Sequence, residues 1–293
     1  RMVDFKKMDD FIASQDEDPS FVPIDKIQPI ANHPFKVVDD DEMEKLVASI
    51  AEHGVLSPVL LRQIGDDRYE MISGHRRMHA AAKVGLKELP AIIRDLTDDE
   101  AIIIMVNSNI QREKLLPSEK AYAYKMCLEA VKHRRASGTE KDIGGAAGER
   151  SRTLTATKFG VSGVQVSRYI RLTYLIPGLL DLVDEEKIQL SVAVQVSYVR
   201  QEVQKMLLDY VQAGHKLPAS KITILKKYRT ALPESAEALY SELESRNTHK
   251  PSKFALSERK LRKYFPSTYS TKDMENVIVK LLEEWKQNHI NKE

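Results

Sequence analysis

One short stretch of the sequence, residues 72–81, places a glycine and two arginines at the predicted start of a helix. An apolar strand runs into Gly74, and the following helix carries Arg76 and Arg77 in its first turn. A helix N-terminus offers free N–H groups and a positive dipole end, and guanidinium groups bind phosphate in a bidentate manner. Arginines are unfavourable at that end unless an anion is present. The stretch predicts a phosphate site, with two solvated surface arginines as the alternative.

A second stretch, residues 153–172, has the pattern of two short helices joined by a tight glycine turn. Gly160 marks the turn, and Ser162 is placed to cap the second helix. Arg152 and Lys158 are predicted to contact a DNA backbone. The exposed face of the second helix would carry side chains suited to base edges and phosphates, namely Gln165, Ser167, Arg168 and Arg171. The pattern indicates a DNA-binding helix-turn-helix, although such pairs of helices also occur in proteins that bind no DNA.

Composition and charge limit the class of protein. The chain has 293 residues, of which 42% are apolar and 30% charged, which suits two or three domains. Residues 1–115 hold 15 Lys and Arg against 22 Asp and Glu, whereas residues 116–293 hold 30 against 21. A basic second part is typical of a segment that meets a polyanion, with scattered surface charge as the alternative. The single cysteine, Cys127, excludes an internal disulfide and a thiolate zinc cluster.

The elements that position these residues follow from the apolar periodicity. Strands are predicted at residues 21–27, 55–62 and 68–73, the last two as a hairpin, and together with the predicted helices they read as an α+β domain that ends near Arg112. Nearer the C-terminus, a linker is predicted at residues 247–253 and a final helix from residue 272 to about residue 286. An acidic run at residues 39–42 precedes an apolar helical stripe and is expected to cap that helix. Beyond Arg112 the pattern is helical, interrupted by a predicted loop at residues 137–152. No stretch approaches the ~20 apolar residues of a membrane span, so we expect a cytoplasmic protein without a membrane partner.

Four sequence motifs along the chain resemble, in their residues and their order, those of the ParB family of bacterial DNA-partition and nucleoid-occlusion proteins. The resemblance is to the branch of the family found on plasmids and integrative elements. The resemblance covers residues 21 to about 199. It rests on residues 54–58, 69–81, 85–92 and 109–122. The resemblance implies an α+β ParB/sulfiredoxin-like domain, then an all-α helix-turn-helix domain, then a small C-terminal helical dimerisation segment. The apolar stripe of the last predicted helix, with Leu281, Leu282 and Trp285, would serve the dimer.

The resemblance also implies domain boundaries. Residues 1–20 would be a mobile tail, and residues 21–112 a ParB-like nucleotide-binding domain. Residues 113–230 would form the helical DNA-binding domain with its helix-turn-helix at residues 153–172. Residues 231–293 would hold a linker and the dimerisation segment.

A site for CTP and Mg²⁺ in the first domain is implied by the same resemblance. The nucleotide-binding residues would be Gly54, Ser57, Pro58, Gly74, His75, Arg76, Arg77, Asn109 and Arg112, with Asn109 also holding the metal. His75 and Ser108 stand at positions where the family has glutamates. The family's glutamate at the position of Ser108 is the one linked to hydrolysis. A serine neither holds Mg²⁺ as a carboxylate does nor acts as a base. The sequence therefore assigns no catalytic residue and leaves a weak CTPase activity open.

The expected function is that of a dimeric clamp on double-stranded DNA. The protein would load at a palindromic site, close with CTP and Mg²⁺, and associate with the nucleoid or a plasmid, with a ParA-type ATPase as a further partner. One alternative is a helix-turn-helix transcriptional repressor of a mobile element that needs no nucleotide. Another is a kinase-like enzyme of the same fold. His75 and His79 have metal-ligand spacing, but no third ligand is apparent nearby.

Overall fold

The structure is a computed structural model that describes residues 18–110, 112, 115–137, 147–245, 261–266 and 268–290. The chain forms two compact units, residues 1–244 and residues 245–293. The predicted tail, up to residue 17, lies outside the described residues. So do residues 138–146 of the predicted loop and the predicted linker at residues 247–253. The boundaries between the three predicted modules stay a prediction.

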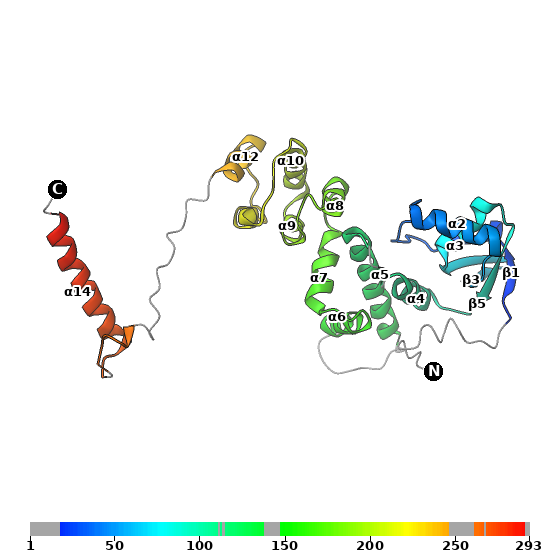
Figure 1. The fold of residues 1–293 in the computed structure, drawn as a ribbon, viewed down its shortest axis with the longest axis horizontal. Helices are drawn as coiled ribbons and strands as arrows, with labels where there is room; N and C mark the ends of the chain where they lie inside the picture. Colours follow the sequence, from blue (N-terminus) through cyan, green and yellow to red (C-terminus); the bar gives the residue numbers. More distant parts are fainter. Residues whose placement is uncertain are drawn as a thin grey trace. The chain divides into compact units, whose positions relative to one another are not determined.

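A five-stranded mixed sheet forms the framework of the first domain (Figure 1). The hairpin predicted from the sequence is confirmed, because β3 and β4 pair antiparallel. β5 pairs parallel with β3 and antiparallel with β1, and β2 pairs parallel with β4. The strand order across the sheet is β1 (Ser20–Pro23), β5 (Glu88–Ile93), β3 (Val59–Gly65), β4 (Arg68–Ser73), β2 (Ile27–Pro29).

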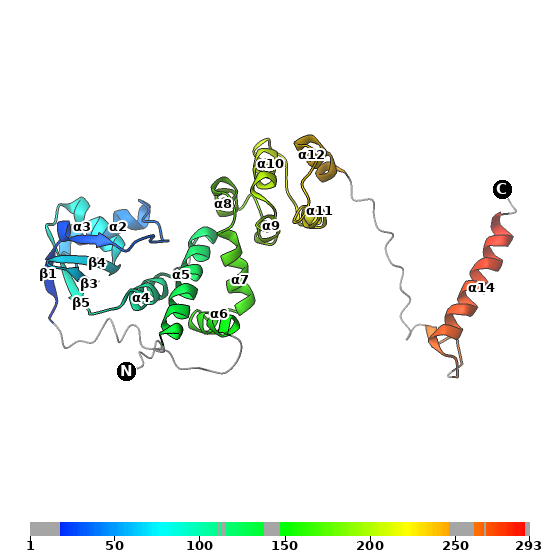
Figure 2. The same cartoon turned by 180° about the vertical axis from the view of Figure 1, so that it is seen from behind.

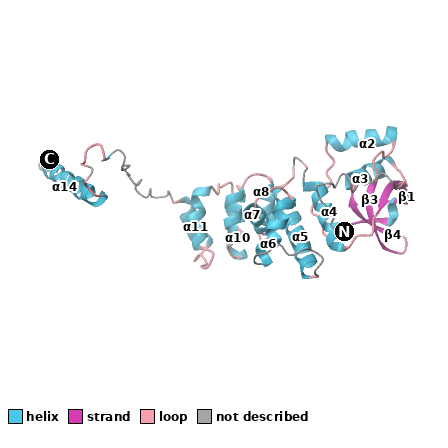
Figure 3. Ribbon diagram, turned by 90° about the horizontal axis from the view of Figure 1, so that it is seen from below, coloured by secondary structure: helices cyan, strands magenta, loops and turns pink. Residues whose placement is uncertain are grey.

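Helices cover both faces of this sheet, and alternate strand residues supply the two cores. Val59 and Leu61 point into the core shared with α2 (Asp41–His53) and α3 (His75–Val84). Leu60 points into the other core, which α4 (Asp98–Ile110) and α5 (Pro117–Ala136) complete. Figure 3 shows α2 and α3 beside the strands. Strand β4, whose central residues are buried, ends at Ser73, and α3 begins at His75.

Three details of the first domain concern its local backbone structure. The acidic run is confirmed as a cap, because the Asp40 carboxylate accepts a hydrogen bond from the Met43 amide at 2.8 Å. The strand predicted to start at Val55 starts at Val59 instead, because residues 54–58 form a loop that Arg77 holds. The strand predicted for residues 21–27 is interrupted by a 3₁₀ turn, Ile24–Lys26.

The helical part begins with α5, which packs against α4, α6 and α7 (Figure 2). α6 starts at Ala147, so the loop prediction is wrong for residues 147–152. The buried side of α6 includes Ser151 and Thr155, and the Thr155 hydroxyl donates to the Ser151 carbonyl at 2.8 Å. Because these buried residues are polar, the helix shows no apolar periodicity. The remaining helices of the first unit are α6 (Ala147–Lys158), α7 (Gly163–Leu172), α8 (Pro177–Asp184), α9 (Leu190–Val196), α10 (Gln201–Gln212), α11 (Ile222–Lys227) and α12 (Ala236–Glu244).

The second unit contains α14 (Thr271–Ile290), which confirms the predicted final helix and extends beyond it. Leu281, Leu282 and Trp285 of its apolar stripe are 58–60% exposed. Among the described residues, no helix combines the length and the apolar character needed to cross a membrane.

Candidate functional site

The turn between β4 and α3 requires glycine at position 74. Gly74 has φ +115°, and a Cβ at this position would lie 2.5 Å from Cγ1 of Val59. The left-handed backbone and the close approach both exclude a side chain. α3 starts at the next residue with no acidic side chain in its first turn and no side-chain cap. Its positive dipole end is therefore uncompensated, which favours a bound anion.

Arg77 holds the loop that precedes β3. Its Nη1 donates to the carbonyls of Ser57 and Pro58, both at 2.7 Å, and to the Ser57 hydroxyl at 3.1 Å. Burial lowers the pKa of this guanidinium. Gly54, at φ +71°, ends α2 and starts the same loop. The structure thus brings four of the predicted residues together, and it assigns Arg77 to the shape of the loop.

Arg76 forms ion pairs with the start of α2. Its Nη2 lies 3.1 Å from an Asp40 carboxylate oxygen, and its Nη1 lies 3.7 Å from Glu42. Such partly exposed pairs contribute little to stability, so the guanidinium is available to a stronger anion. Arg76 also lies near Arg112, where its positive charge adds to burial in lowering the pKa of the Arg112 guanidinium.

His75, the first residue of α3, lies against a histidine that sequence reasoning missed. The rings of His33 and His75 are 4.0 Å apart between centroids, with an interplanar angle of 44°. Nε2 of each ring is buried and has no hydrogen-bond partner. Burial lowers the pKa of His75 to about 3, helped by His33 and Arg112, and burial also lowers the pKa of His33. Buried polar atoms without partners are rare and costly, so these two mark a place for a ligand.

Glu119 lies in the motif at residues 109–122, but no role at the site was predicted for it. Its carboxylate accepts hydrogen bonds from the backbone amides of Lys36 at 2.8 Å and Leu116 at 2.9 Å. These bonds join the loop before α2 to the start of α5, so Glu119 is a structural group beside the site. No spacing pattern connects His33 to residues 72–81, so sequence reasoning had no signal for that histidine.

Asn109 and Ser108 lie at the end of α4 and make hydrogen bonds within that helix. The Asn109 amide nitrogen donates to the Met105 carbonyl at 2.8 Å, and the Ser108 hydroxyl donates to the same carbonyl at 3.0 Å. Of the side-chain atoms of Asn109 and Ser108, the Asn109 amide oxygen is the one suited to binding a cation. Among the described residues, no group of three or more His, Cys, Asp or Glu side chains is arranged to hold a metal ion. His79 turns to Asp39 at 2.9 Å, so it does not converge with His75.

The predicted DNA-contact residues lie on α6 and α7, which are joined by a turn at residues 159–162. Ser162 is confirmed as the cap of α7, because its hydroxyl accepts from the Gln165 amide at 3.1 Å. Gln165 and Arg168 are exposed on α7, and Arg152 is exposed on α6. Ser167 is half-buried and donates to the Gly163 carbonyl, and the Lys158 side chain lies outside the described part.

Arg171 differs from the other predicted contact residues. It donates to the hydroxyl and the carbonyl of Ser197, and its guanidinium lies 4.4 Å from the Tyr174 ring centroid and 3.9 Å from that of Tyr198. These contacts connect the end of α7 to the end of α9. The structure therefore places Arg171 in the packing between helices, while Gln165 and Arg168 face outward.

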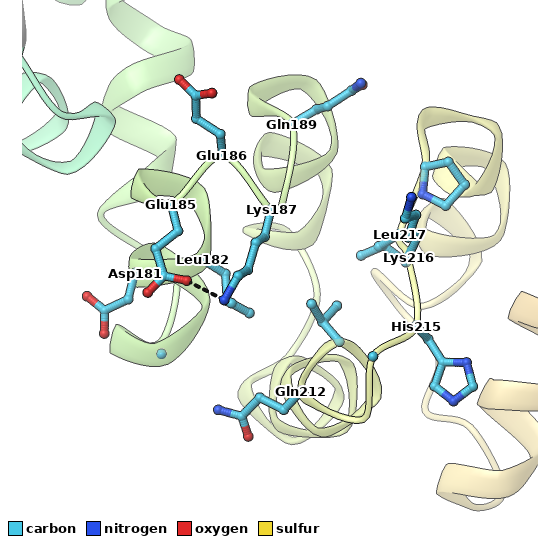
Figure 4. Close-up of a pocket in the computed structure, with 14 residues that line it drawn as sticks. Asp181, Leu182, Glu185, Glu186, Lys187, Gln189, Gln212, His215, Lys216 and Leu217 are labelled. Carbon is cyan, nitrogen blue, oxygen red and sulfur yellow. Dashed lines mark ion pairs between the residues drawn. The ribbon is translucent and has the colours of Figure 1, made fainter.

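A separate cavity of about 900 Å³ lies between α8, α10 and the segment after α10 (Figure 4). An ion pair between Lys187 and Glu185, at 2.7 Å, lies along it. None of the predicted site residues lines this cavity.

Comparison with known proteins gives a consistent picture of the first domain. Residues 9–110 match the family model described as the ParB N-terminal domain. A nucleoid occlusion protein of Listeria innocua is 38% identical over 126 residues, which cover 43% of this chain and 44% of that protein. One from Bacillus thuringiensis is 42% identical over 108 residues, covering 37% of each chain. The chain thus spans less than half the length of these curated relatives.

Solved structures were similar at lower identity. The C-terminally truncated ParB of Caulobacter crescentus in complex with the centromeric parS site is 22% identical, with a TM-score of 0.41, and covers 72% of this chain and 100% of that one. The same protein in complex with CTP-gamma-S is 24% identical, with a TM-score of 0.31, and covers 66% of this chain and 99% of that one.

Proposed function

We propose that this chain is a member of the family of ParB and nucleoid occlusion proteins, because its residues 9–110 match the ParB N-terminal domain and two nucleoid occlusion proteins are 38% and 42% identical to it over part of their length. In this proposal it is a dimeric, sequence-specific DNA-binding protein that takes CTP in its N-terminal domain. In this proposal the nucleotide turns a DNA-bound dimer into a clamp, and the protein associates with the nucleoid or a plasmid. A ParA-type ATPase partner stays a prediction.

The observation that carries the nucleotide part is the pair of arginines at the start of α3 and after the end of α4. Arg76 and Arg112 lie near enough for the charge of Arg76 to lower the pKa of the Arg112 guanidinium. Mutually repelling arginines are stabilised by an anion placed between them. The uncompensated dipole of α3 acts in the same direction. These features support a site for a highly charged anion such as a triphosphate.

Base and ribose would lie along the loop of residues 54–58, which Arg77 fixes in shape before any ligand arrives. A preformed loop lowers the entropic cost of binding. Gly74 lets the backbone of the turn approach the phosphates.

Mg²⁺ fits this donor set less well than the nucleotide does. Mg²⁺ is held through carboxylates and phosphate oxygens, and Glu119, a carboxylate near enough to His33 to affect the pKa of that imidazole, already accepts hydrogen bonds from two backbone amides. Asn109 would supply one oxygen, and the phosphates and water would supply the others. Because the Ser108 hydroxyl donates into its own helix, the proposal includes no hydrolysis step.

The DNA part of the proposal rests on the exposed face of α7. Gln165 and Arg168 are exposed there, and both side-chain types make bidentate contacts with bases in the major groove. Arg152 is placed to contact the DNA backbone. The apolar stripe of α14 would be covered by the same helix of a second chain, since an isolated helix of this length is marginal in water. A two-fold dimer suits a palindromic DNA site.

The proposal is tested by the length of the DNA footprint with and without CTP. The DNA carries one palindromic site selected by the protein from a random pool. CTP is expected to extend protection beyond the two half-sites, because a clamp can move away from its loading site. The variant Arg76→Ala/Arg112→Ala should lose this extension, whereas the exposed hairpin variant Arg68→Ala should keep it. A wild-type footprint that CTP leaves unchanged contradicts the clamp and favours a nucleotide-independent repressor.

A further inference from the structure

Two histidines lie beside the proposed nucleotide site, His75 buried and His33 half-buried, and a hydrogen bond of His33 identifies which of its ring nitrogens carries the proton. Nδ1 of His33 lies 2.8 Å from the Phe35 carbonyl oxygen. A carbonyl accepts hydrogen bonds and cannot donate one, so Nδ1 carries the proton. In the neutral ring the other nitrogen, Nε2, then presents a lone pair. That lone pair is buried and has no partner.

An imidazole held in this way has the form of a metal ligand. Metal-binding histidines generally donate their second N–H to a backbone carbonyl or carboxylate, which orients the ring and selects the tautomer. Nε2 of the neighbouring His75 is likewise buried and without a partner, and the His75 residue is 8% exposed.

The separation of the two rings suits one ion. Two imidazoles bound in cis positions to an octahedral ion, with metal–nitrogen bonds of about 2.1 Å, have centroids about 4.6 Å apart. The observed separation between the two ring centroids is 4.0 Å, so the rings need to move only slightly apart to bind one ion together.

The surrounding charges determine when an ion could bind. Arg112 lies close enough to His75 to lower the pKa of that imidazole, and Arg76 lies near Arg112. This positive surrounding repels a bare cation. A triphosphate would neutralise both arginines and supply the oxygen ligands that two histidines alone do not provide.

We propose that His33 and His75 together bind a divalent transition-metal ion that arrives with the nucleotide, so that this chain prefers a nitrogen-binding ion such as Co²⁺ where carboxylate-bearing sites would take Mg²⁺. The inference rests on the proposed nucleotide binding. It connects two features of the chain, a histidine in the place of a glutamate at residue 75 and a serine in the place of a glutamate at residue 108. Imidazole nitrogen favours first-row transition ions, whereas Mg²⁺ prefers oxygen.

The direct test is pulsed electron paramagnetic resonance of the full chain with Mn²⁺ and CTP. Couplings to imidazole ¹⁴N are expected in the wild type and in His79→Asn, a control on the same helix. They should be absent in His33→Asn/His75→Asn. A wild-type spectrum that shows bound Mn²⁺–CTP without nitrogen coupling overturns the inference, whatever the stability of the variants.

Calorimetric titrations separate this inference from the function on which it rests. We expect Co²⁺–CTP to bind the wild type about tenfold more tightly than Mg²⁺–CTP, and the two complexes to bind the double variant equally. Equal binding of both complexes to the wild type overturns the metal preference and leaves CTP binding intact. No binding of CTP with any of the ions overturns the proposed function itself.

Discussion

The two regions predicted to contact ligands are built in opposite ways. The anion site collects residues from the loop before α2, the loop of residues 54–58, the start of α3 and the end of α4, and its imidazoles are buried without partners. The face of α7 comes from one helix, and its key side chains are exposed. The first region holds buried polar atoms that have no partner among the described residues, whereas the second presents polar side chains on an exposed helix face.

The same contrast appears within each region, because one arginine in each is used by the protein itself. Arg77 is hydrogen-bonded to the loop carbonyls, and Arg171 is hydrogen-bonded to Ser197 between two tyrosine rings. Their neighbours are bonded less firmly, because Arg76 forms only partly exposed ion pairs with Asp40 and Glu42 and Arg168 is exposed on α7. A sequence motif identifies the residue type that a ligand needs. Only the structure shows which of two neighbouring arginines already hydrogen-bonds to the protein backbone.

The largest expected effect concerns the turn of the anion site. Gly74→Ala would bring a Cβ to 2.5 Å from Val59 in a left-handed backbone, so we expect a loss of about 3 kcal/mol of unfolding free energy together with loss of CTP binding. Urea unfolding measures the first effect and calorimetry the second. Gly85→Ala is the matched control, since Gly85 also has a positive φ but open space around it, and about 1 kcal/mol is expected there. Equal losses of unfolding free energy in the two variants would contradict the close approach of residue 74 to Val59.

The next effect concerns the buried imidazole. The pKa of His75 is depressed to about 3 in the folded protein and is near 6.5 in the unfolded chain, so the unfolded state takes up the proton first as pH falls. The stabilisation is present above pH 6.5 and is lost below it, by about 2 kcal/mol between pH 7 and pH 5. Unfolding in EDTA at both pH values measures this loss. His75→Gln should flatten the dependence, and His53→Gln, at an exposed histidine, should not. An unchanged slope in His75→Gln would contradict the burial of that ring.

A third comparison separates the two arginines of α7. Arg168→Ala is expected to weaken specific DNA binding by about 1–3 kcal/mol while leaving unfolding unchanged. Arg171→Ala is expected to lower the unfolding free energy by about 1–2 kcal/mol, because it removes the hydrogen bonds to Ser197 and the stack between two tyrosines. Gel-shift titration and urea unfolding distinguish them. The reverse pattern would place Arg171 at the bases.

The smallest effect concerns the cap of α7. Ser162→Ala removes the acceptor of the Gln165 amide and should cost about 1 kcal/mol, whereas Ser162→Asn, which retains a cap, should cost almost nothing. Thermal unfolding measures the difference. Equal melting temperatures for the two variants would argue that the cap does not stabilise the helix.

Much of this structure could be predicted from residue patterns, and the failures have physical causes. The hairpin, the Asp40 and Ser162 caps and the start of α3 depend on neighbouring residues, which periodicity and capping rules describe. The start of α6 was missed because its buried side includes hydroxyl groups that bond to their own helix. His33 was missed, and no role at the site was predicted for Glu119, because both reach the site from distant segments through contacts that no local spacing encodes.

The central claim is that the buried site at the start of α3 binds CTP, and calorimetric titration of the full chain tests it most directly. CTP, CDP and ATP are each titrated into wild type, Arg76→Ala/Arg112→Ala and the control Arg68→Ala, with the same divalent ion present. The account predicts selective binding of CTP to the wild type and to Arg68→Ala, and no binding to the double variant. Failure of every nucleotide to bind the wild type, even with operator DNA present, would contradict it.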